Sequence, residues 1–304
     1  MKSDYEKIRG KVNKLKDTYN FRGPLHFTDF KNLNSIISIG YLCGRDLCYA
    51  NHIEFYDVGD EEVIKNVPGN VKGSTRFYYV EKNNYTVMER LKIPVYLLFS
   101  EEILYYDLAN YTDGNADYSS TIYGTDGDFF KYDMDWKIIF DKRDIDMPEC
   151  FKGSVEELFC SKKQSELLID EPVPLNQLKN IIFRCNADYK RACNLFGKNK
   201  MFLVEPHMFF NDKNYILDYN IVYNAVTDCD VFILHFSSNE PVKPDDRHEY
   251  RLYDMNDKLI RVAKVNFSGS DNTDFHVEVA NLPCSLVKFK FWFYGTLCIE
   301  ETIG

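Results

Sequence analysis

Four short segments of the 304-residue chain carry most of the side chains that could do chemistry. They are LHFTD around His26, RFYY from Arg76, the turn TDGN at 112–115, and KKQSELLID around Glu166. A carboxylate such as Glu166 can stabilise a developing positive charge or take up a proton. Taken singly, each segment is weak evidence, because a lone His or Glu at a strand end usually has a structural or solvated role.

The sequence contains none of the common short motifs of nucleotide-binding, metalloprotease or hydrolase sites. A P-loop, a GxGxxG turn after a strand, HExxH and GxSxG are all absent. The nine cysteines are irregularly spaced without a CxxC pair, and the histidines after residue 200 show no ligand spacing. We therefore expect no metal site.

The elements that must position these residues can be predicted from periodicity and turn residues. Apolar positions at steps of three and four predict a helix over 5–19. Asp29 is expected to cap a second helix through Ile37, which Gly40 closes in a left-handed turn. Two strands follow at 75–80 and 94–100, and the polar stretch 107–135 is expected to be one long loop.

The second half of the sequence predicts a change of architecture. Strands at 164–170 and 180–185 are followed by a helix from Asn186 to near Gly197. Short β-branched and aromatic segments alternating with turns then predict an all-β sandwich of immunoglobulin-like size. The expected strands are 219–223, 231–236, 249–253, 259–267, 275–279 and 286–297. The fold class is thus α+β, with domains at 1–200 and 201–304.

Composition limits the classes of protein. The net charge is −10, so nucleic acid would be held by a local basic stripe and only briefly, since stable binding by counterion release needs a basic protein. The N-terminus has no apolar core like that of a signal peptide, and no apolar run is long enough to cross a bilayer. Reduced cysteines and a cytoplasmic location are expected, with no membrane association.

Together and in this order, the segments resemble the DarT family, the toxins of DarTG toxin–antitoxin pairs. The matching text is HFTDFKNLNSIISIG at 26–40, TRFYY at 75–79 and KKQSELLIDEPVPLNQLKNIIFRC at 162–185. TDGN matches the SDGN of some relatives. The resemblance covers roughly residues 20–197, and its first and third blocks are specific as a pair.

The resemblance implies an ADP-ribosyltransferase with a split β-sheet flanked by helices, using NAD as co-substrate and no metal. The expected acceptor is a nucleobase, thymine or guanine, in single-stranded DNA, and a macrodomain-type antitoxin is the expected partner. Cleavage of the nicotinamide–ribose bond passes through an oxocarbenium-like state, which a carboxylate stabilises.

The resemblance also assigns roles to individual residues. Glu166 is the expected catalytic carboxylate, held ionised by Lys162 and Lys163 if they reach it, and Arg76 is expected to assist. Tyr78 is the expected nicotinamide-stacking aromatic, because alternation places it on the opposite face from its neighbours. The full set expected to bind NAD is His26, Phe27, Thr28, Asn32, Gly40, Arg45 and Tyr78. The residues expected to contact the acceptor are Lys163, Asp113 and Asn115.

One departure from the family pattern concerns the cation that pairs with the NAD phosphates. Residues 54–74 contain no arginine, and Lys65 and Lys72 are their only cations, so Arg76 or Arg45 is expected to substitute. Two other readings stay open. The acceptor could be RNA or a protein side chain, or the chain could be a non-catalytic protein of the same fold that binds NAD or nucleic acid.

Overall fold

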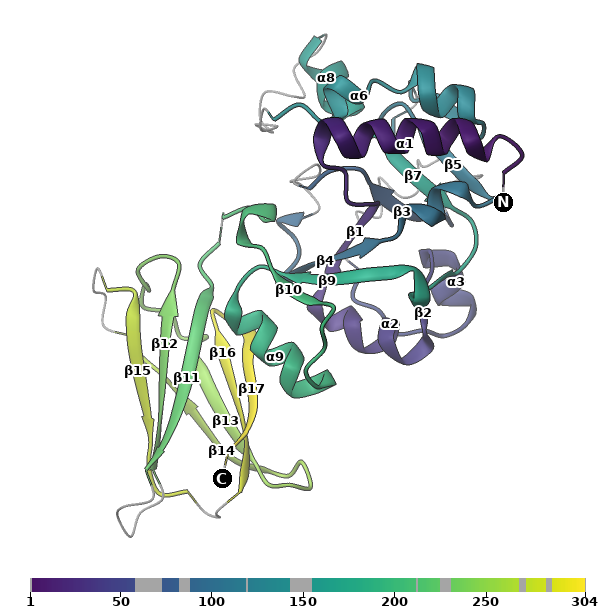
Figure 1. Cartoon of the computed structure of the whole chain (residues 1–304). Coiled ribbons are helices and arrows are strands. Elements are labelled where there is room, and N and C mark those ends of the chain that lie inside the picture. The colour runs from purple at the N-terminus through teal and green to yellow at the C-terminus, as the bar shows by residue number, and fades with distance from the viewer. Residues whose placement is uncertain are drawn as a thin grey trace. The chain divides into compact units, whose positions relative to one another are not determined.

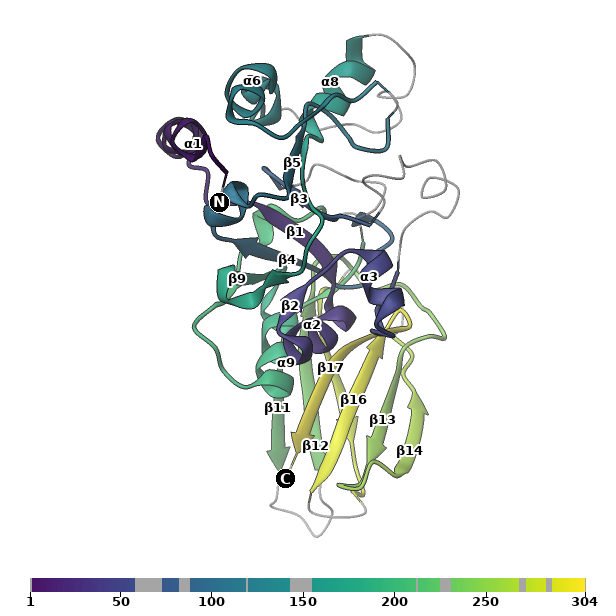
Figure 2. The same cartoon turned by 90° about the vertical axis from the view of Figure 1, so that its right-hand side faces the viewer.

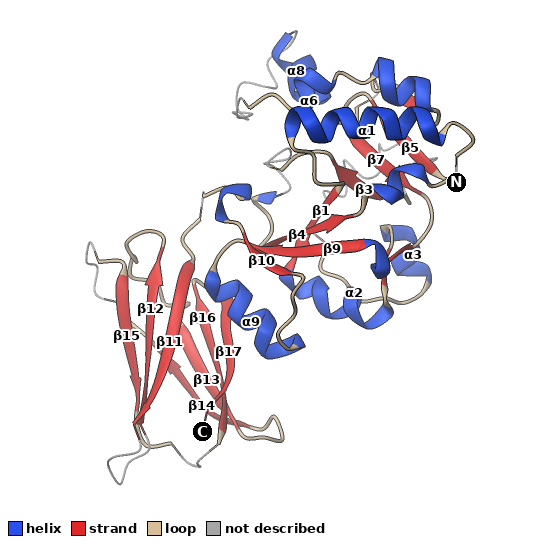
Figure 3. Ribbon diagram, viewed as in Figure 1, coloured by secondary structure: helices blue, strands red, loops and turns tan. Residues whose placement is uncertain are grey.

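The structure is a computed structural model that describes residues 2–57, 73–81, 88–118, 120–142, 155–211, 213–224, 231–267, 272–282 and 286–303. The chain divides into two compact units. The first comprises Met1–Ile182 with Met208–Phe210, and the second comprises Phe183–His207 with Asn211–Gly304. Figure 1 shows the units in chain colours, and Figure 3 shows that the second is built mostly of strands.

An eight-stranded sheet in the order β10-β9-β4-β1-β3-β7-β5-β6 organises the N-terminal part. Its strands are β1 (Leu25–Asp29), β3 (Thr75–Tyr78), β4 (Pro94–Phe99), β5 (Ala109–Thr112), β6 (Tyr123–Gly124), β7 (Glu166–Ile169), β9 (Leu178–Phe183) and β10 (Phe202–Val204). Every residue of β4 and of β7 is buried, as expected for apolar strands covered on both faces.

β1 and β3 pair with each other through fewer residues than each pairs with its other neighbour in the sheet. β1 pairs with β4 through five residues, from Leu25↔Leu98 to Asp29↔Pro94. β3 pairs with β7 through four, from Thr75↔Ile169 to Tyr78↔Glu166. Between β1 and β3, however, the register contains the single pair Leu25↔Tyr78. The middle of the sheet is therefore held by one ladder pair.

Helices of the first unit gather in two groups, seen from two directions in Figures 1 and 2. α1 (Tyr5–Tyr19), α6 (Trp136–Ile139) and α8 (Val155–Lys163) lie beside β5 and β7, whereas α2 (Leu33–Ile39) and α3 (Arg45–Ala50) lie near β2 (Tyr41–Leu42). α1 buries Ile8, Val12 and Leu15, so the predicted helix over 5–19 is confirmed. β2 pairs with β8 (Val173–Pro174) in a separate two-stranded sheet.

The turn residues around α2 act largely as predicted. Asp29 accepts a hydrogen bond from the Lys31 amide and so caps a short 3-10 turn, Phe30–Asn32, that leads into α2. Gly40 ends α2 in the left-handed conformation, with φ of 79°. The prediction for 107–135 is partly wrong, because β5 lies inside it. Ala109 and Tyr111 are fully buried, and they pair β5 with β7 although the surrounding sequence is polar.

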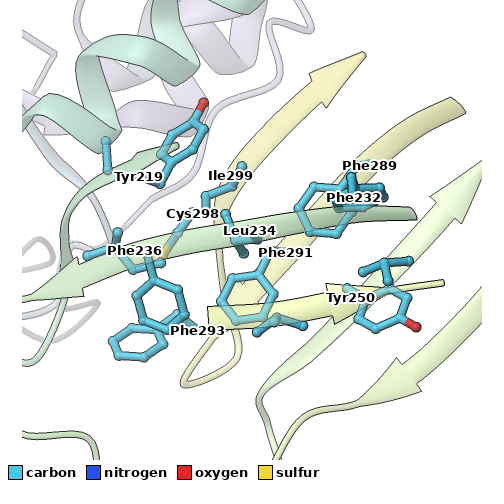
Figure 4. Packing of buried hydrophobic residues seen from close by; sticks show 14 of the residues in the cluster. Tyr219, Phe232, Leu234, Phe236, Tyr250, Phe289, Phe291, Phe293, Cys298 and Ile299 are labelled. Carbon is cyan, nitrogen blue, oxygen red and sulfur yellow. The ribbon is translucent and has the colours of Figure 1, made fainter. Parts of the chain in front are cut away.

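Apart from β10, the second unit consists of α9 (Asn186–Phe196) and the antiparallel strands of two further sheets. A three-stranded sheet contains β11 (Ile216–Asn224), β12 (Val231–Ser238) and β15 (Asp274–Val279). A four-stranded sheet contains β14 (Leu259–Lys264), β13 (Glu249–Tyr253), β16 (Val287–Phe293) and β17 (Thr296–Ile303). Aromatic residues of the two sheets meet in one core (Figure 4), where the rings of Phe232 and Phe289 lie 5.0 Å apart.

The segment predicted as one strand at 286–297 is a hairpin. Tyr294 and Gly295 have φ of 47° and 74°, so the two residues form a tight turn between Phe293 and Thr296. Positive φ at both central positions matches the right-handed twist of the flanking strands. The turn was missed because tyrosine is common in β-strands, so Tyr294 does not indicate a turn in the sequence.

Contacts of α9 group this helix with the second unit. Arg191 Nη1 donates to the Leu297 carbonyl at 2.7 Å, and Asn194 Nδ2 donates to the Glu300 carbonyl at 3.0 Å. The expected domain boundary at residue 200 places α9 in the first domain, whereas the compact units divide after Ile182. The boundary itself stays a prediction.

Two further observations concern cysteines and membranes. Cys43, Cys48, Cys185, Cys193 and Cys298 are free thiols. Cys160 is disulfide-bonded, so the expectation that the cysteines are reduced is not met at that position. Within the described ranges, no helix combines the length and the hydrophobicity needed to cross a bilayer.

Candidate active site

Glu166 lies at the first position of β7 and is almost completely buried, with 1% of its surface exposed. In the antiparallel ladder it lies opposite Tyr78 of β3, so the two side chains point to the same face of the sheet. Arg76, two residues before Tyr78, shares that face. The sheet thus brings together three predicted residues that are up to 90 positions apart.

The loop after β5 fixes one side of Glu166. The β5–β7 ladder ends at Tyr111↔Leu167, and the Thr112 hydroxyl then accepts a hydrogen bond from the Glu166 amide at 2.8 Å. The same hydroxyl donates to the Gly114 carbonyl at 2.6 Å. Farther along the loop, the Ala116 amide donates to Glu166 Oε2 at 2.8 Å. The backbone therefore holds one carboxylate oxygen, whereas Oε1 is buried and receives no hydrogen bond from the backbone or from Arg76. The Tyr78 side chain is the other group that interacts with this carboxylate.

Arg76 lies between two carboxylates. Its Nη2 is 2.7 Å from Asp117 Oδ1, and its Nη1 is 3.6 Å from Glu166 Oε1. The shorter distance is that of a close ion pair, and the longer one exceeds hydrogen-bonding range. Arg76 therefore makes its tight contact with Asp117 and acts on Glu166 mainly through its charge.

Burial and neighbouring charges set the protonation behaviour of this group. Burial raises the pKa of Glu166 above its usual range, and Asp117 raises it further. The Arg76 charge, the Ala116 amide and the Tyr78 side chain oppose this rise only in part. Burial also acts to lower the pKa of Arg76, but Glu166 and Asp117 outweigh it and raise that pKa. The guanidinium consequently stays charged.

Tyr78 is the aromatic residue that shares the face of Glu166, as strand alternation predicts. Its ring stacks on Phe27 of β1 with centroids 5.1 Å apart and an interplanar angle of 17°. Phe77 and Tyr79 point to the opposite face, where they pack against Phe99 and Trp136. Burial raises the pKa of Tyr78, so its hydroxyl remains protonated.

His26 lies in β1, next to the short β1–β3 pairing. Its Nδ1 is 2.9 Å from the Arg76 carbonyl oxygen. A carbonyl can only accept, so Nδ1 must carry the proton of this bond. Burial lowers the pKa of His26, with the Arg76 carbonyl opposing the shift. In the neutral ring Nε2 is then the acceptor, which suits a hydroxyl donor.

The other residues expected at the NAD site form a connected frame. Asn32 donates through Nδ2 to Thr28 Oγ1 at 2.9 Å and to the Tyr56 carbonyl at 3.1 Å, and its Oδ1 accepts from the Tyr56 amide at 2.6 Å. Arg45 begins α3, and its Nη2 lies 2.5 Å from Asp57 Oδ1. Lys65 and Lys72 lie outside the described residues.

The three residues expected to contact the acceptor make contacts that shape loops. Asp113 Oδ1 accepts from the Ile122 amide at 2.8 Å, and Asn115 is buried and donates to Gln164. Lys163 is buried and donates to the Asp141 carbonyl at 2.7 Å, while Lys162 Nζ is 4.0 Å from Asp135. The largest cationic influence on the pKa of Glu166 is Arg76, and these lysine contacts go to Asp141 and Asp135, so the role expected of the lysines at Glu166 stays a prediction.

Residues 25–210 match the protein family described as ssDNA thymidine ADP-ribosyltransferase, DarT. The chain belongs to the DarT family. This match confirms the predicted family and enzyme class, and it extends past the predicted end of the resemblance at residue 197. A comparison with curated proteins found no match.

Solved DarT structures resemble the fold at low sequence identity. Thermus sp. 2.9 DarT in complex with ADP-ribosylated ssDNA is 11% identical, with a TM-score of 0.51, and the match covers 63% of this chain and 97% of that one. Thermosipho africanus DarTG in complex with ADP-ribose is 15% identical, with a TM-score of 0.49, covering 66% of this chain and 53% of that one. The first likeness confirms a DarT-like α+β fold over about two thirds of the chain, and antiparallel sheets make up the rest.

Several residues of this DarT site were missed by sequence reasoning. Asp117 pairs with Arg76, the Ala116 amide binds Glu166, and Tyr123 donates to the Ala116 carbonyl at 2.7 Å. The sequence offered one signal, because Ala116 and Asp117 follow the TDGN turn directly. The turn was interpreted as a possible acceptor contact, which stays a prediction, and in the structure its contacts hold the loop that supports Glu166.

Proposed function

We propose that this DarT chain transfers ADP-ribose from NAD⁺ to thymidine in single-stranded DNA, with Glu166 as the catalytic carboxylate. The observation that carries the proposal is the buried Glu166 carboxylate, with Oε2 held by the Ala116 amide and Oε1 lying beside Arg76 without a hydrogen bond from it, on the face shared with Tyr78. A buried acceptor without a partner is costly unless a ligand completes it. A hydroxyl of the nicotinamide-bearing ribose is a donor of the right kind.

The ionised Glu166 carboxylate can perform two tasks in the transfer reaction. When the bond between nicotinamide and ribose breaks, positive charge develops on the ribose, and the ionised Glu166 stabilises it. The attacking thymine nitrogen loses its proton as the new glycosidic bond forms, and the carboxylate can take up that proton. A raised pKa favours this second task, because it makes Glu166 a stronger base than an exposed Glu.

On the NAD⁺ side, the contacts above support a role for each of four residues. His26 Nε2 accepts a ribose hydroxyl, and Tyr78, backed by Phe27, offers an aromatic face to nicotinamide. Two carboxylates neutralise Arg76, so Arg45 is the better candidate to pair with the phosphates, after release from Asp57. Thr28, Asn32 and Gly40 hold the frame in which these groups lie.

On the acceptor side, the proposal rests on family membership. Single strands suit the reaction because the target base must be unstacked to reach a buried site. The Thermus relative contains ADP-ribosylated ssDNA, which supports DNA as the acceptor class. Asp113, Asn115 and Lys163 contribute by shaping the loops that border Glu166.

The proposed architecture has a transferase domain at 1–200 and an accessory domain at 201–304. The single β1–β3 ladder pair supports a split sheet in the first domain. Two antiparallel sheets sharing an aromatic core support an immunoglobulin-like sandwich in the second. As a DarT toxin, the chain would act in the cytoplasm beside a macrodomain-type antitoxin.

The direct test incubates the protein with labelled NAD⁺ and oligonucleotides that differ only in sugar and base. We expect transfer to single-stranded DNA containing thymidine, none to the same strand without thymidine, and none by Glu166→Ala. If ADP-ribose is transferred only to RNA or only to protein, the proposed DNA acceptor is wrong. The absence of both transfer and NAD⁺ cleavage would instead identify a binding protein without turnover.

A further inference from the structure

The short contact between Arg76 and Asp117 bears directly on Glu166. Asp117 Oδ1 is buried and lies 2.7 Å from Arg76 Nη2 in an ion pair that lacks regular hydrogen-bond geometry, while Arg76 Nη1 stays 3.6 Å from Glu166 Oε1. A guanidinium can bind a carboxylate through two parallel hydrogen bonds. Here Arg76 is paired with Asp117, so it makes no hydrogen bond to Glu166 Oε1.

We propose that Asp117 is a positioning residue of the transferase site, which holds Arg76 away from Glu166 and so keeps Oε1 free for a ribose hydroxyl. This inference rests on the proposed function of Glu166. It adds a requirement that the family resemblance did not supply, since Asp117 lies outside the matching text. Without Asp117, Arg76 closes the last part of its 3.6 Å gap and pairs with Oε1.

Loop geometry ties Asp117 to the same structure that holds Oε2. The Asp117 amide donates to Asn115 Oδ1 at 2.9 Å, and the preceding amide, that of Ala116, donates to Glu166. Consecutive residues thus act on the two sides of one carboxylate. Ala116 fixes Oε2 directly, and Asp117 acts on Oε1 through Arg76.

The two effects of Asp117 on Glu166 have the same direction. Its negative charge disfavours ionisation of Glu166. Its ion pair with Arg76 also keeps the compensating positive charge at a distance from Glu166. Both make Glu166 a stronger base. Removing Asp117 therefore weakens Glu166 as a base and also occupies its free oxygen.

The experiment compares the wild type with Asp117→Asn, Asp117→Glu and a matched control, Asp128→Asn. Asp128 also pairs with a cation, Lys7 at 2.6 Å, but it is exposed on the surface. For Asp117→Asn we expect kcat to fall on the order of 10- to 100-fold, the effect of losing one close charged contact. KM for NAD⁺ should change less, Asp117→Glu should recover part of the rate, and Asp128→Asn should match the wild type.

The pH profile separates positioning from simple structural damage. Loss of Asp117 should move the acid limb of kcat to lower pH by about 1 unit, because Glu166 then ionises more easily. A variant that is merely damaged loses rate at every pH without moving the limb. An unmoved limb, or a wild-type rate in Asp117→Asn, overturns the proposal.

A second measurement does not need turnover. The pKa of Glu166, followed by carbon-13 NMR, should fall in Asp117→Asn and stay near the wild-type value in Asp117→Glu. If the wild type proves inactive, this titration still tests the inference, so the two failures are distinct. If neither Asp117→Asn nor Asp117→Ser folds, Asp117 has a role in stability instead, and the proposal is wrong.

Discussion

Replacing Thr112 by valine should destabilise the first unit and impair Glu166 at the same time. The two side chains have nearly the same shape, so the change removes the hydroxyl and little else. That hydroxyl is fully buried, accepts from the Glu166 amide at 2.8 Å and donates to the Gly114 carbonyl at 2.6 Å. Valine can make neither bond.

The size of the effect follows from these two bonds. A buried amide left without a partner costs about 1–3 kcal/mol, and loss of the bond to Gly114 adds about 0.5–1.5 kcal/mol. The expected loss in the free energy of unfolding is therefore roughly 2–4 kcal/mol. For a unit of this size, this corresponds to a fall in Tm of roughly 5–15 °C.

The assay combines thermal unfolding with the transfer reaction. Thr112→Ser, which keeps the hydroxyl, is the matched control and should stay close to the wild type in both. Below its own Tm, Thr112→Val should still have a lower kcat, because the loop that carries the Ala116 amide loses its anchor. A Tm within about 1 °C of the wild type, together with an unchanged kcat, would show that the hydroxyl does not hold Glu166.

Three other predictions concern the same site. Glu166→Gln should abolish transfer yet raise Tm at neutral pH. Folding raises the pKa of the Glu166 carboxyl, so its ionisation lowers the stability of the folded state at any pH above the unfolded-state pKa. The gain in Tm should therefore vanish as the pH falls below about 4. An unchanged Tm at every pH would refute this. Asn32→Ala removes three bonds to Thr28 and Tyr56 and should lower stability by about 1–3 kcal/mol, measured by urea unfolding. The control is Asn110→Ala, which removes two longer bonds of 3.4 Å from a half-buried asparagine and should cost less. Arg45→Ala should change stability by less than about 1 kcal/mol but raise KM for NAD⁺; an unchanged KM would contradict its phosphate role.

Local patterns predicted those elements whose signals are local. The helix over 5–19 could be predicted because its buried residues recur at helical spacing, and Gly40 because a helix end needs a left-handed residue. β5 could not, because its burial depends on pairing with β7, which lies more than fifty residues away. The hairpin at Tyr294 was hidden for the opposite reason, since a strand-like residue occupies a turn.

The candidate site divides in a similar way. Glu166, Arg76 and Tyr78 were predicted, and strand register places them on one face. Asp117 was missed because its pairing with Arg76 joins segments about forty residues apart, which no local pattern records. Lys162 and Lys163 adjoin this segment in sequence, yet they contact Asp135 and the Asp141 carbonyl, because proximity along the chain does not set the direction of a side chain.

The lone ladder pair between Leu25 and Tyr78 has a mechanical consequence. The sheet consists of two parts, one ending at β1 and the other at β3. They are joined by that ladder pair and by the hydrogen bond from His26 Nδ1 to the Arg76 carbonyl. A seam with so few bonds spreads under less force than the ladders on either side, which hold four and five pairs. His26 therefore joins β1 to β3 in addition to its proposed contact with NAD⁺, and a movement of its ring away from the Arg76 carbonyl would weaken the junction between the two strands.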